Sequence, residues 1–302
     1  MGKNKKVRAA DELELQGKIK ELVIIAMFSD DILMERFVLK GGNALDLIHH
    51  VSARASVDID LSIDGDFSLE LRDVLRDRID KALGDTFGPE GYQVFDVTVE
   101  EQPKELTSDV EEFWGGYSVE FKVIKRDRYE ELKDDREKLR RNAMQLGQGT
   151  KFSVDISKHE YTIGKRPFDF GGFTVFVYTP EMIVCEKLRA ICQQMPEYGP
   201  VVKRERAGRS RARDFVDICT LMTRRDINLK TDENRKLLGH VFACKRVQLA
   251  LLRIVARYRE FHRASFDLVV ATVKPGTELN DFDFYFDFVL GLIEELEPLG
   301  NE

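Results

Sequence analysis

The chain has 302 residues, of which 43% are hydrophobic and 33% are charged, and its formal net charge is -7 at pH 7. These proportions are typical of a soluble globular protein with a sizeable core. The negative net charge disfavours a protein that binds nucleic acid without sequence specificity. The sequence contains neither a signal peptide nor an apolar run long enough to span a bilayer, so we expect a cytoplasmic protein with no membrane partner.

Apolar periodicity predicts a mixture of helices and strands up to residue 179. Helix caps, glycines and prolines set the limits of these elements. In chain order they are a helix over Asp11–Leu33, a strand over Phe37–Leu39, a helix from Asn43, a strand over Val57–Ile63, a helix after Ser68, strands over Tyr92–Val99 and Tyr117–Ile124, a helix over Arg128–Met144, and strands over Lys151–Ser157 and Phe173–Tyr178.

Helical sequence dominates the rest of the chain. Thr179-Pro180-Glu181 combines an N-cap, a proline suited to the first turn and an acid near the positive end of the helix dipole. A loop over Met195–Gly208 separates two helices, and the last helix is predicted over Asp281–Leu296. All four cysteines lie in this part without metal-ligand spacing, and they are predicted to be buried free thiols.

We therefore expect an α+β chain of two lobes, residues 1–179 and the mostly helical residues 180–302. Charge is unevenly distributed along it. Lys187–Arg225 contains ten Lys or Arg against four Asp or Glu, whereas residues 276–302 contain eight acids and no Lys or Arg. This polarity suits a protein that presents one basic face to a polyanion. The alternative is that such runs mark solvated helix faces.

An acid pair on a predicted strand is the strongest chemical signal. Asp58 and Asp60 alternate with apolar Val57, Ile59 and Leu61, so both carboxylates lie on one face of the strand. Mg²⁺ is typically held by a few carboxylates together with substrate phosphates, and nucleotidyl transfer uses two such ions. The pair therefore predicts metal-dependent nucleotidyl transfer, with a polar strand face turned to water as the alternative.

A third acid follows on a later strand. Phe152, Val154 and Ile156 face one way on the predicted strand, and Asp155 faces the other way. Asp155 would complete the metal set as the carboxylate nearest the acceptor hydroxyl. A water-facing strand residue is an equally good interpretation.

Gly41 and Gly42 lie where a predicted strand gives way to a helix. Their amides and the helix N-terminus can approach phosphate oxygens without obstruction by a Cβ atom. The spacing is neither that of a P-loop nor that of a dinucleotide-binding turn. The Gly-Gly turn is significant because the acid pair follows it after one predicted helix.

Two predicted helices of the second lobe carry further charged candidates. Lys187 could neutralise triphosphate charge, and Asp214 could orient either Lys187 or the acceptor. The alternative is a surface ion pair between Arg213 and Asp217, four residues apart, with Lys187 as a solvated helix residue.

Four segments taken together resemble a known family. Leu39–Leu45, Arg54–Leu61, Glu186–Ala190 and Arg213–Ile218 are similar, in this order, to the successive motifs of the AbiEii/AbiGii-type nucleotidyltransferase toxins. These toxins are relatives of the DNA polymerase β-like nucleotidyltransferases. The match spans residues 36–222.

The resemblance implies a mixed nucleotidyltransferase sheet with flanking helices and a mostly helical C-terminal lobe that completes the active site. It also implies use of a nucleoside triphosphate with Mg²⁺, and membership of a bacterial toxin–antitoxin or phage-defence system with a possible cognate antitoxin. Some members are similar to enzymes that add nucleotides to the acceptor end of tRNA and so stop translation.

By position, the resemblance implies contacts to the nucleotide, metal ligands, and two further residues that complete the site. Asn43 stands where Thr or Ser is common in the family. The implied residues are Gly41, Gly42, Asn43, Ser56 and Lys187 for the nucleotide, Asp58 and Asp60 for the metal, with Asp155 as a less clean match, and Lys187 and Asp214 to complete the site.

These observations lead to one main hypothesis and two rivals. The main hypothesis is an Mg²⁺-dependent enzyme that moves NMP from an NTP onto a hydroxyl, with RNA such as tRNA as the acceptor. One rival keeps the chemistry and changes the acceptor to a small molecule or a protein side chain. The other is a binding module whose site has lost catalysis.

Overall fold

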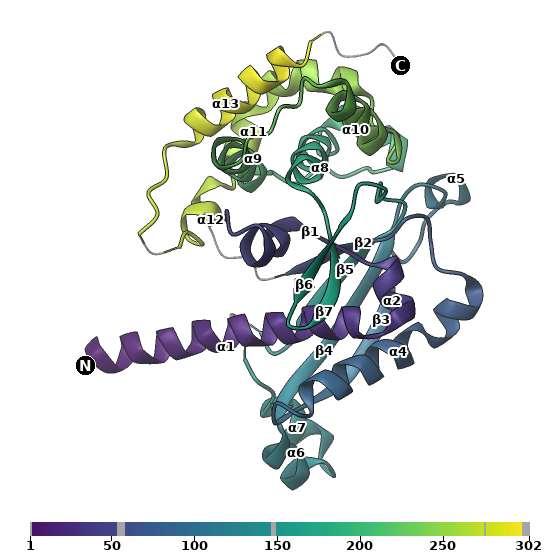
Figure 1. Ribbon diagram of the computed structural model, residues 1–302, viewed down its shortest axis with the longest axis vertical. Helices are drawn as coiled ribbons and strands as arrows, with labels where there is room; N and C mark the ends of the chain where they lie inside the picture. The colour runs from purple at the N-terminus through teal and green to yellow at the C-terminus, as the bar shows by residue number, and fades with distance from the viewer. Residues whose placement is uncertain (1, 53–57, 146–148, 275, 298–302) are drawn as a thin grey trace.

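The computed structural model describes residues 2–52, 58–145, 149–274 and 276–297. Its central feature is a seven-stranded mixed sheet (Figure 1). The strands are β1 (Val38–Lys40), β2 (Ile59–Ser62), β3 (Tyr92–Gln102), β4 (Gly116–Lys125), β5 (Phe152–Ser157), β6 (Arg166–Phe170) and β7 (Phe173–Val177). Their order in the sheet is β3-β4-β5-β2-β1-β7-β6.

Helices and short helical turns connect these strands. In the first part of the chain they are α1 (Gly2–Ser29), α2 (Asp31–Arg36), α3 (Gly41–Asn43), the π-helix η1 (Ala44–Ile48), α4 (Leu69–Phe87), α5 (Ser108–Glu111), α6 (Arg126–Leu132) and α7 (Arg136–Arg141). Figure 1 shows α1 and α4 crossing the sheet, where α1 contacts β7 and α4 contacts β3.

From residue 180 onward, every described element is a helix. These helices are α8 (Pro180–Cys192), η2 (Pro196–Val202), α9 (Ala212–Arg224), α10 (Asp232–Ala243), η3 (Leu249–Tyr258), α11 (Arg259–Arg263), α12 (Phe266–Val270) and α13 (Phe282–Glu295). They gather at one end of the sheet, opposite the tip formed by α6 and α7 (Figure 1). The α+β fold with a mixed sheet and a mostly helical second half is as predicted.

Two parallel pairings set the geometry of the sheet centre. β2 pairs in parallel with β5, and β1 pairs in parallel with β7, while β1 and β2 are antiparallel. β3 and β4, which contain the two strands predicted over Tyr92–Val99 and Tyr117–Ile124, form a long antiparallel pair. Strands distant in the chain therefore become neighbours at the centre.

Two predicted helices are broken in the structure. The helix expected over Asp11–Leu33 ends at Ser29, because the Asp30 carboxylate accepts hydrogen bonds from the next turn and caps α2. The helix expected over Arg128–Met144 is divided into α6 and α7, and Asp135 caps α7 in the same way. In both cases a short acidic side chain competes with helix continuation.

The sequence pattern did not predict β6, and the bounds that it predicted for other elements differ from those in the structure. β6 is an edge strand with four exposed residues out of five, so it lacks the alternation of a half-buried strand. Pro167 lies within it, as is typical of edge strands. The helix expected from Asn43 already begins at Gly41, and Val57 of the predicted acid strand lies outside the described residues.

The hydrophobic core is continuous from the sheet into the helical part. The Phe215 ring of α9 stacks on Phe286 of α13 with 4.9 Å between centroids, whereas Phe284 is 48% exposed. Phe282 and Phe286 of the last helix are thus core residues. Cys185, Cys192 and Cys219 are buried free thiols, while Cys244 is a partly exposed one.

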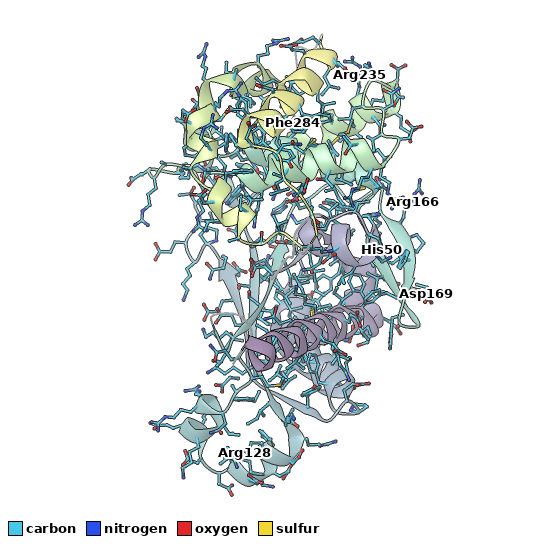
Figure 2. All side chains as sticks on the ribbon, turned by 90° about the vertical axis from the view of Figure 1, so that its left-hand side faces the viewer. His50, Arg128, Arg166, Asp169, Arg235 and Phe284 are labelled. Carbon is cyan, nitrogen blue, oxygen red and sulfur yellow. The ribbon has the colours of Figure 1, made fainter. Side chains whose placement is uncertain are left out.

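Side chains cover the molecule from the tip near Arg128 to the helices that carry Arg235 and Phe284 (Figure 2). Within the described parts of the chain, no helix combines the length and the apolar character required to cross a membrane.

Candidate active site

The centre of the sheet brings two predicted acids side by side. Asp60 in β2 is paired with Lys40 in β1 on one side and with Asp155 in β5 on the other. Asp58 directly precedes β2. The parallel register of β2 and β5 therefore places acids far apart in sequence at the same level of the sheet.

These residues line a cavity of about 680 Å³ between the end of the sheet and the helical part. Figure 1 shows α8 and α9 lying over this end of the sheet. The predicted site residues that line the cavity are Gly41, Gly42, Asp58, Asp60, Asp155, Lys187 and Asp214. Ser56 lies outside the described residues.

The glycine turn is shaped by its contact with the acid strand. Gly41 has a φ angle of +66°, which L-residues with a side chain rarely adopt. A Cβ atom at Gly41 would also overlap the Asp60 carboxylate. Glycine is thus required both for the turn and for the approach of Asp60.

Asn43 is fully buried and turned towards the acid strand. Its Nδ2 donates a hydrogen bond to the backbone carbonyl of Asp58 (2.6 Å). The structure therefore places Asn43 as a residue that positions Asp58. A Thr or Ser hydroxyl can also donate a hydrogen bond, but its side chain is shorter than that of Asn43.

The carboxylates lie in an environment that disfavours their negative charge. Burial raises the pKa of Asp60 to about 6, although Lys40 and Arg213 act in the opposite direction. Burial also raises the pKa of Asp155, whose carboxylate accepts a hydrogen bond from the Ser118 hydroxyl (3.3 Å). A bound cation would therefore stabilise the negative charge of both carboxylates.

The donor set fits a cation that takes only a few protein ligands. Among the described residues, no three His, Cys, Asp or Glu side chains converge closely enough to form a ready metal cage. The three predicted ligands therefore line one cavity without forming a preassembled cluster. Mg²⁺ is commonly bound by one or two carboxylates, with water and substrate phosphates completing its shell, so Asp58 and Asp60 suit it.

Lys187 is buried and doubly ion-paired. Its Nζ donates to Asp214 (2.9 Å) and to Asp217 (2.8 Å), and its side chain is 5% exposed. Burial favours protonation of Asp214, but Lys187, Arg211 and Arg213 together hold its pKa well below the usual range. The interpretation of Lys187 as a solvated helix residue is therefore wrong, and Asp214 does orient it.

Sequence reasoning missed a second buried network around Glu160. Its carboxylate lies 2.8 Å from Arg189 Nη1 and 3.5 Å from Lys40 Nζ, and Lys245 is 3.8 Å away. Despite burial, these cations hold the pKa of Glu160 well below the usual range. Two features of the sequence could have indicated this network. Lys40 ends an apolar strand, and Arg189 lies among apolar residues on α8, so each places a charge where the neighbouring residues are buried.

A cationic wall closes the cavity from the side of α9. Arg209, Arg211 and Arg213 all line it, from the loop before α9 and from its first turn. The Arg213 side chain is exposed, and its charge lowers the pKa of both Asp60 and Asp214. Part of the predicted basic segment therefore faces the acid strand.

Several buried polar atoms of the cavity wall have no hydrogen-bond partner in the described structure. Buried polar groups are normally satisfied, so a cluster of exceptions indicates a place for water or a ligand. The atoms are Arg189 Nε, Gln193 Nε2, Arg211 Nε and Asp214 Oδ2.

Solved structures similar to this chain include JHP933 from Helicobacter pylori, with a TM-score of 0.47 and 17% identity over 94% of each chain. A second H. pylori structure has the same TM-score and identity and covers 98% of this chain and 99% of that one. An antigenic nucleotidyltransferase-like protein from Paracoccidioides brasiliensis gives a TM-score of 0.35 and 15% identity over 84% of this chain and 94% of that one. No curated protein sequence matches.

The model of one protein family, described as nucleotidyl transferase AbiEii toxin, Type IV TA system, matches residues 23–288. That span contains the whole sheet and the helices that enclose the cavity, so the protein is a nucleotidyltransferase. More narrowly, the chain belongs to the AbiEii family of toxins from type IV toxin–antitoxin systems. Membership confirms the resemblance found in the motifs and implies a cognate antitoxin.

Proposed function

We propose that the protein is a cytoplasmic, Mg²⁺-dependent toxin with a role in phage defence. It transfers NMP from an NTP to a hydroxyl at the end of an RNA, such as the acceptor end of tRNA, and releases pyrophosphate as the bond between the α- and β-phosphates breaks. The observation that carries this proposal is the register of β2 and β5, which sets Asp60 beside Asp155 and next to the Gly41 turn in one cavity.

The residues of the acid strand have distinct proposed roles. Asp58 and Asp60 hold the metal, which supplies Lewis-acid stabilisation of the phosphate charge when bound. Asp155, held by Ser118, accepts the proton of the attacking hydroxyl at its carboxylate. Its raised pKa supports this role, because a stronger base takes the proton more readily.

The glycine turn beside the acid strand and Lys187 on α8 are proposed to hold the phosphates. The backbone amides of Gly41 and Gly42 carry no side chain that would keep a phosphate at a distance. Lys187 adds a positive charge at a position fixed by Asp214 and Asp217. A phosphate that approaches Lys187 meets an ammonium whose rotamer is already fixed, and Arg211 and Arg213 beside Asp214 supply the further positive charge.

The arginines beside α9 support RNA as the acceptor. The protein is negative overall, yet Arg209, Arg211 and Arg213 are concentrated at the cavity. Lys and Arg side chains near a site bind the phosphate backbone of nucleic acid by neutralising its charge. An acceptor that is small and uncharged would gain nothing from this wall.

Transfer of label from radiolabelled NTP tests the proposal. Asp58→Asn and Asp60→Asn are expected to abolish labelling of total RNA, because each removes a metal ligand. Asp73→Asn on the exposed side of α4 serves as the matched control and should retain full activity. Retained labelling in both site variants would contradict the proposed site.

The same assay distinguishes the acceptor classes. Incubation of a mixed labelled NTP pool with cell extract is expected to label RNA, and size fractionation then identifies the species. Label in polypeptide or in a low-mass product would replace RNA by one of the rival acceptors. Absence of transfer together with absence of NTP binding in calorimetry would favour a module without catalysis.

A further inference from the structure

Two chemically different groups of residues line the cavity. At one end Ser118 of β4 holds the Asp155 carboxylate, and Glu186 of α8 lies 3.7 Å from Lys40 Nζ. The lining face of α8 continues from Glu186 to Gln193. Because a helix rises 1.5 Å per residue, this face extends the cavity by about 10 Å away from the acids.

The far end is built around Trp114, the single tryptophan of the chain. Its ring centroid lies 6.0 Å from that of Tyr198, and Lys245 Nζ is 5.3 Å from the indole ring. The Tyr198 hydroxyl donates to the Lys245 carbonyl oxygen (2.7 Å). These contacts fix a partly exposed aromatic side chain in the cavity wall.

The position of Trp114 also depends on the two glycines that follow it. Gly115 has a φ angle of +111°, and a Cβ atom at Gly116 would overlap the Ile156 carbonyl oxygen. The backbone here lies directly against β5, where Gly116 is paired with Ser157, so there is no space for a side chain at Gly116.

Gln193 at the end of α8 faces the same place and is 6% exposed. Its backbone is fixed, because its carbonyl accepts from Arg204 Nη1 (2.9 Å) and its N–H donates to the Arg189 carbonyl (2.9 Å). The carboxamide lies close enough to the Tyr198 hydroxyl to lower the pKa of that phenol against the effect of burial, but its Nε2 has no acceptor in full hydrogen-bond geometry within the described structure. A buried amide donor of this kind is suited to an acceptor atom on a ligand.

We infer that Trp114 and Gln193 receive the nucleobase of the incoming nucleoside triphosphate, an inference that rests on the proposed nucleotidyl transfer. The base stacks on the open part of the indole, and a ring carbonyl or ring nitrogen accepts a hydrogen bond from Gln193 Nε2. The triphosphate then lies towards Gly41 and Lys187, at the other end of the cavity.

Enclosure favours the base of the NTP over a base of the acceptor. Gln193 is almost inaccessible to solvent, whereas the wall at Arg213 is exposed. An RNA end must stay connected to the rest of its strand, so it needs the open side. A mononucleotide can be enclosed completely.

Because Trp114 is the single tryptophan, its fluorescence reports on this subsite in the unaltered protein. Titration with each of the four NTPs in the presence of Mg²⁺ is expected to change the emission in a saturable way. Inorganic tripolyphosphate, which has no base, is expected to bind without this change. An equal change with tripolyphosphate would overturn the inference.

Base selectivity provides the second test. Gln193→Ala is expected to change the ratio of kcat/KM between the best and the worst NTP by about tenfold, as loss of one hydrogen bond to a base allows. Gln93→Ala, on β3 with its amide donating to a local carbonyl, is the matched control and should leave the ratio unchanged. An unchanged ratio in Gln193→Ala would overturn the inference.

Further outcomes separate this inference from the proposed function. NTP binding by calorimetry, with RNA labelling but no fluorescence change, would refute the base subsite and leave nucleotidyl transfer intact. A Trp114→Phe variant that loses affinity for RNA but not for NTP would assign the subsite to the acceptor and so refute it as well. Absence of NTP binding and of transfer in the unaltered protein would refute both proposals.

Discussion

At the scale of single residues, the position of Asp60 depends on the absence of a side chain at Gly41. The turn needs a positive φ angle, and the space that a Cβ atom would take is filled by the Asp60 carboxylate. Gly41 is therefore as important for the acid strand as for the approach of a phosphate.

Gly41→Ala is expected to lower transfer activity more strongly than stability. The positive φ angle costs about 1 to 2 kcal/mol of unfolding free energy for an L-residue, while displacement of Asp60 removes a metal ligand. Urea denaturation measures the first effect and RNA labelling the second. Gly172→Ala, with a φ angle of +83° and open space around it, is the control that carries backbone strain alone. Full activity in Gly41→Ala would refute this dependence.

His262 gives the fold an acid-sensitive contact. It is fully buried, and its Nδ1 accepts a hydrogen bond from the Arg211 N–H (3.2 Å). Burial lowers the pKa of His262 to about 4, with Asp214 acting in the opposite direction and Arg211 in the same one. Since this pKa lies below that of the unfolded chain, the stabilisation is complete above pH 6.5 and is lost as the pH falls towards 4.

Between pH 7 and pH 4, the unaltered protein should lose up to about 3 kcal/mol more unfolding free energy than His262→Gln, which cannot titrate there. Denaturation curves at each pH measure this difference. The variant starts from a lower stability, so the slope with pH is the quantity compared. Equal slopes would show that His262 does not titrate on unfolding.

The residue scale also shows what a sequence pattern can and cannot reveal. The acid pair and the glycine turn were predictable, because strand alternation and turn chemistry are local. The ion pair between Lys40 and Glu160 joins residues 120 apart, and no local pattern contains it. Burial of a charge depends on which elements meet, and that is decided by tertiary packing.

At the scale of elements, α8 and α9 are joined by a buried charge cluster. Lys187 on α8 is bound by Asp214 and Asp217 on α9, and all three side chains are at most 5% exposed. One lysine cannot neutralise two carboxylates, and Arg211 lies 3.7 Å from Asp214. The contact between the two helices therefore depends on correct charge pairing.

Lys187→Met is expected to destabilise the protein by about 3 to 5 kcal/mol, because it leaves buried carboxylates without their partner. The triple variant Lys187→Met, Asp214→Asn, Asp217→Asn should recover much of that loss while remaining inactive. Thermal unfolding and RNA labelling measure the two properties. A triple variant no more stable than Lys187→Met would contradict the pairing argument.

Element boundaries were predicted less well than element types. Asp30 and Asp135 each end one helix and cap the next, although apolar periodicity continues past both. Each cap depends on the aspartate carboxylate accepting backbone N–H groups, and apolar periodicity carries no information about such hydrogen bonds. β6 was missed because exposed Phe168 and Pro167 give it no alternating pattern.

At the scale of the whole molecule, charge is organised around the cavity. The basic segment predicted from composition meets the acid strand there, while α6 and α7 form a distant tip that also carries arginines (Figures 1 and 2). Composition alone could not say whether the basic segment Lys187–Arg225 faces the site. The sheet order and the placement of α9 decide it.

RNA binding should therefore depend on salt through the cavity arginines. Arg209→Ala and Arg213→Ala are each expected to lower the slope of log Kd against log salt by about 0.7 for a single-stranded acceptor. Arg128→Ala, at the tip in Figure 2 and ion-paired with Glu131, is the control and should leave the slope unchanged. Filter binding from low to high salt measures the slopes. Equal slopes in all three variants would place the RNA elsewhere.

The distribution of the cavity residues along the chain has a consequence during protein synthesis. The acid strand leaves the ribosome early, whereas Asp214 on α9 and Lys245 after α10 are made much later. A nascent chain that has completed only the sheet carries Lys40 beside Asp60, but it lacks the cations of the helical part. We therefore expect chains that end before α9 to be inactive, so that transfer activity arises only once the helical part has been made.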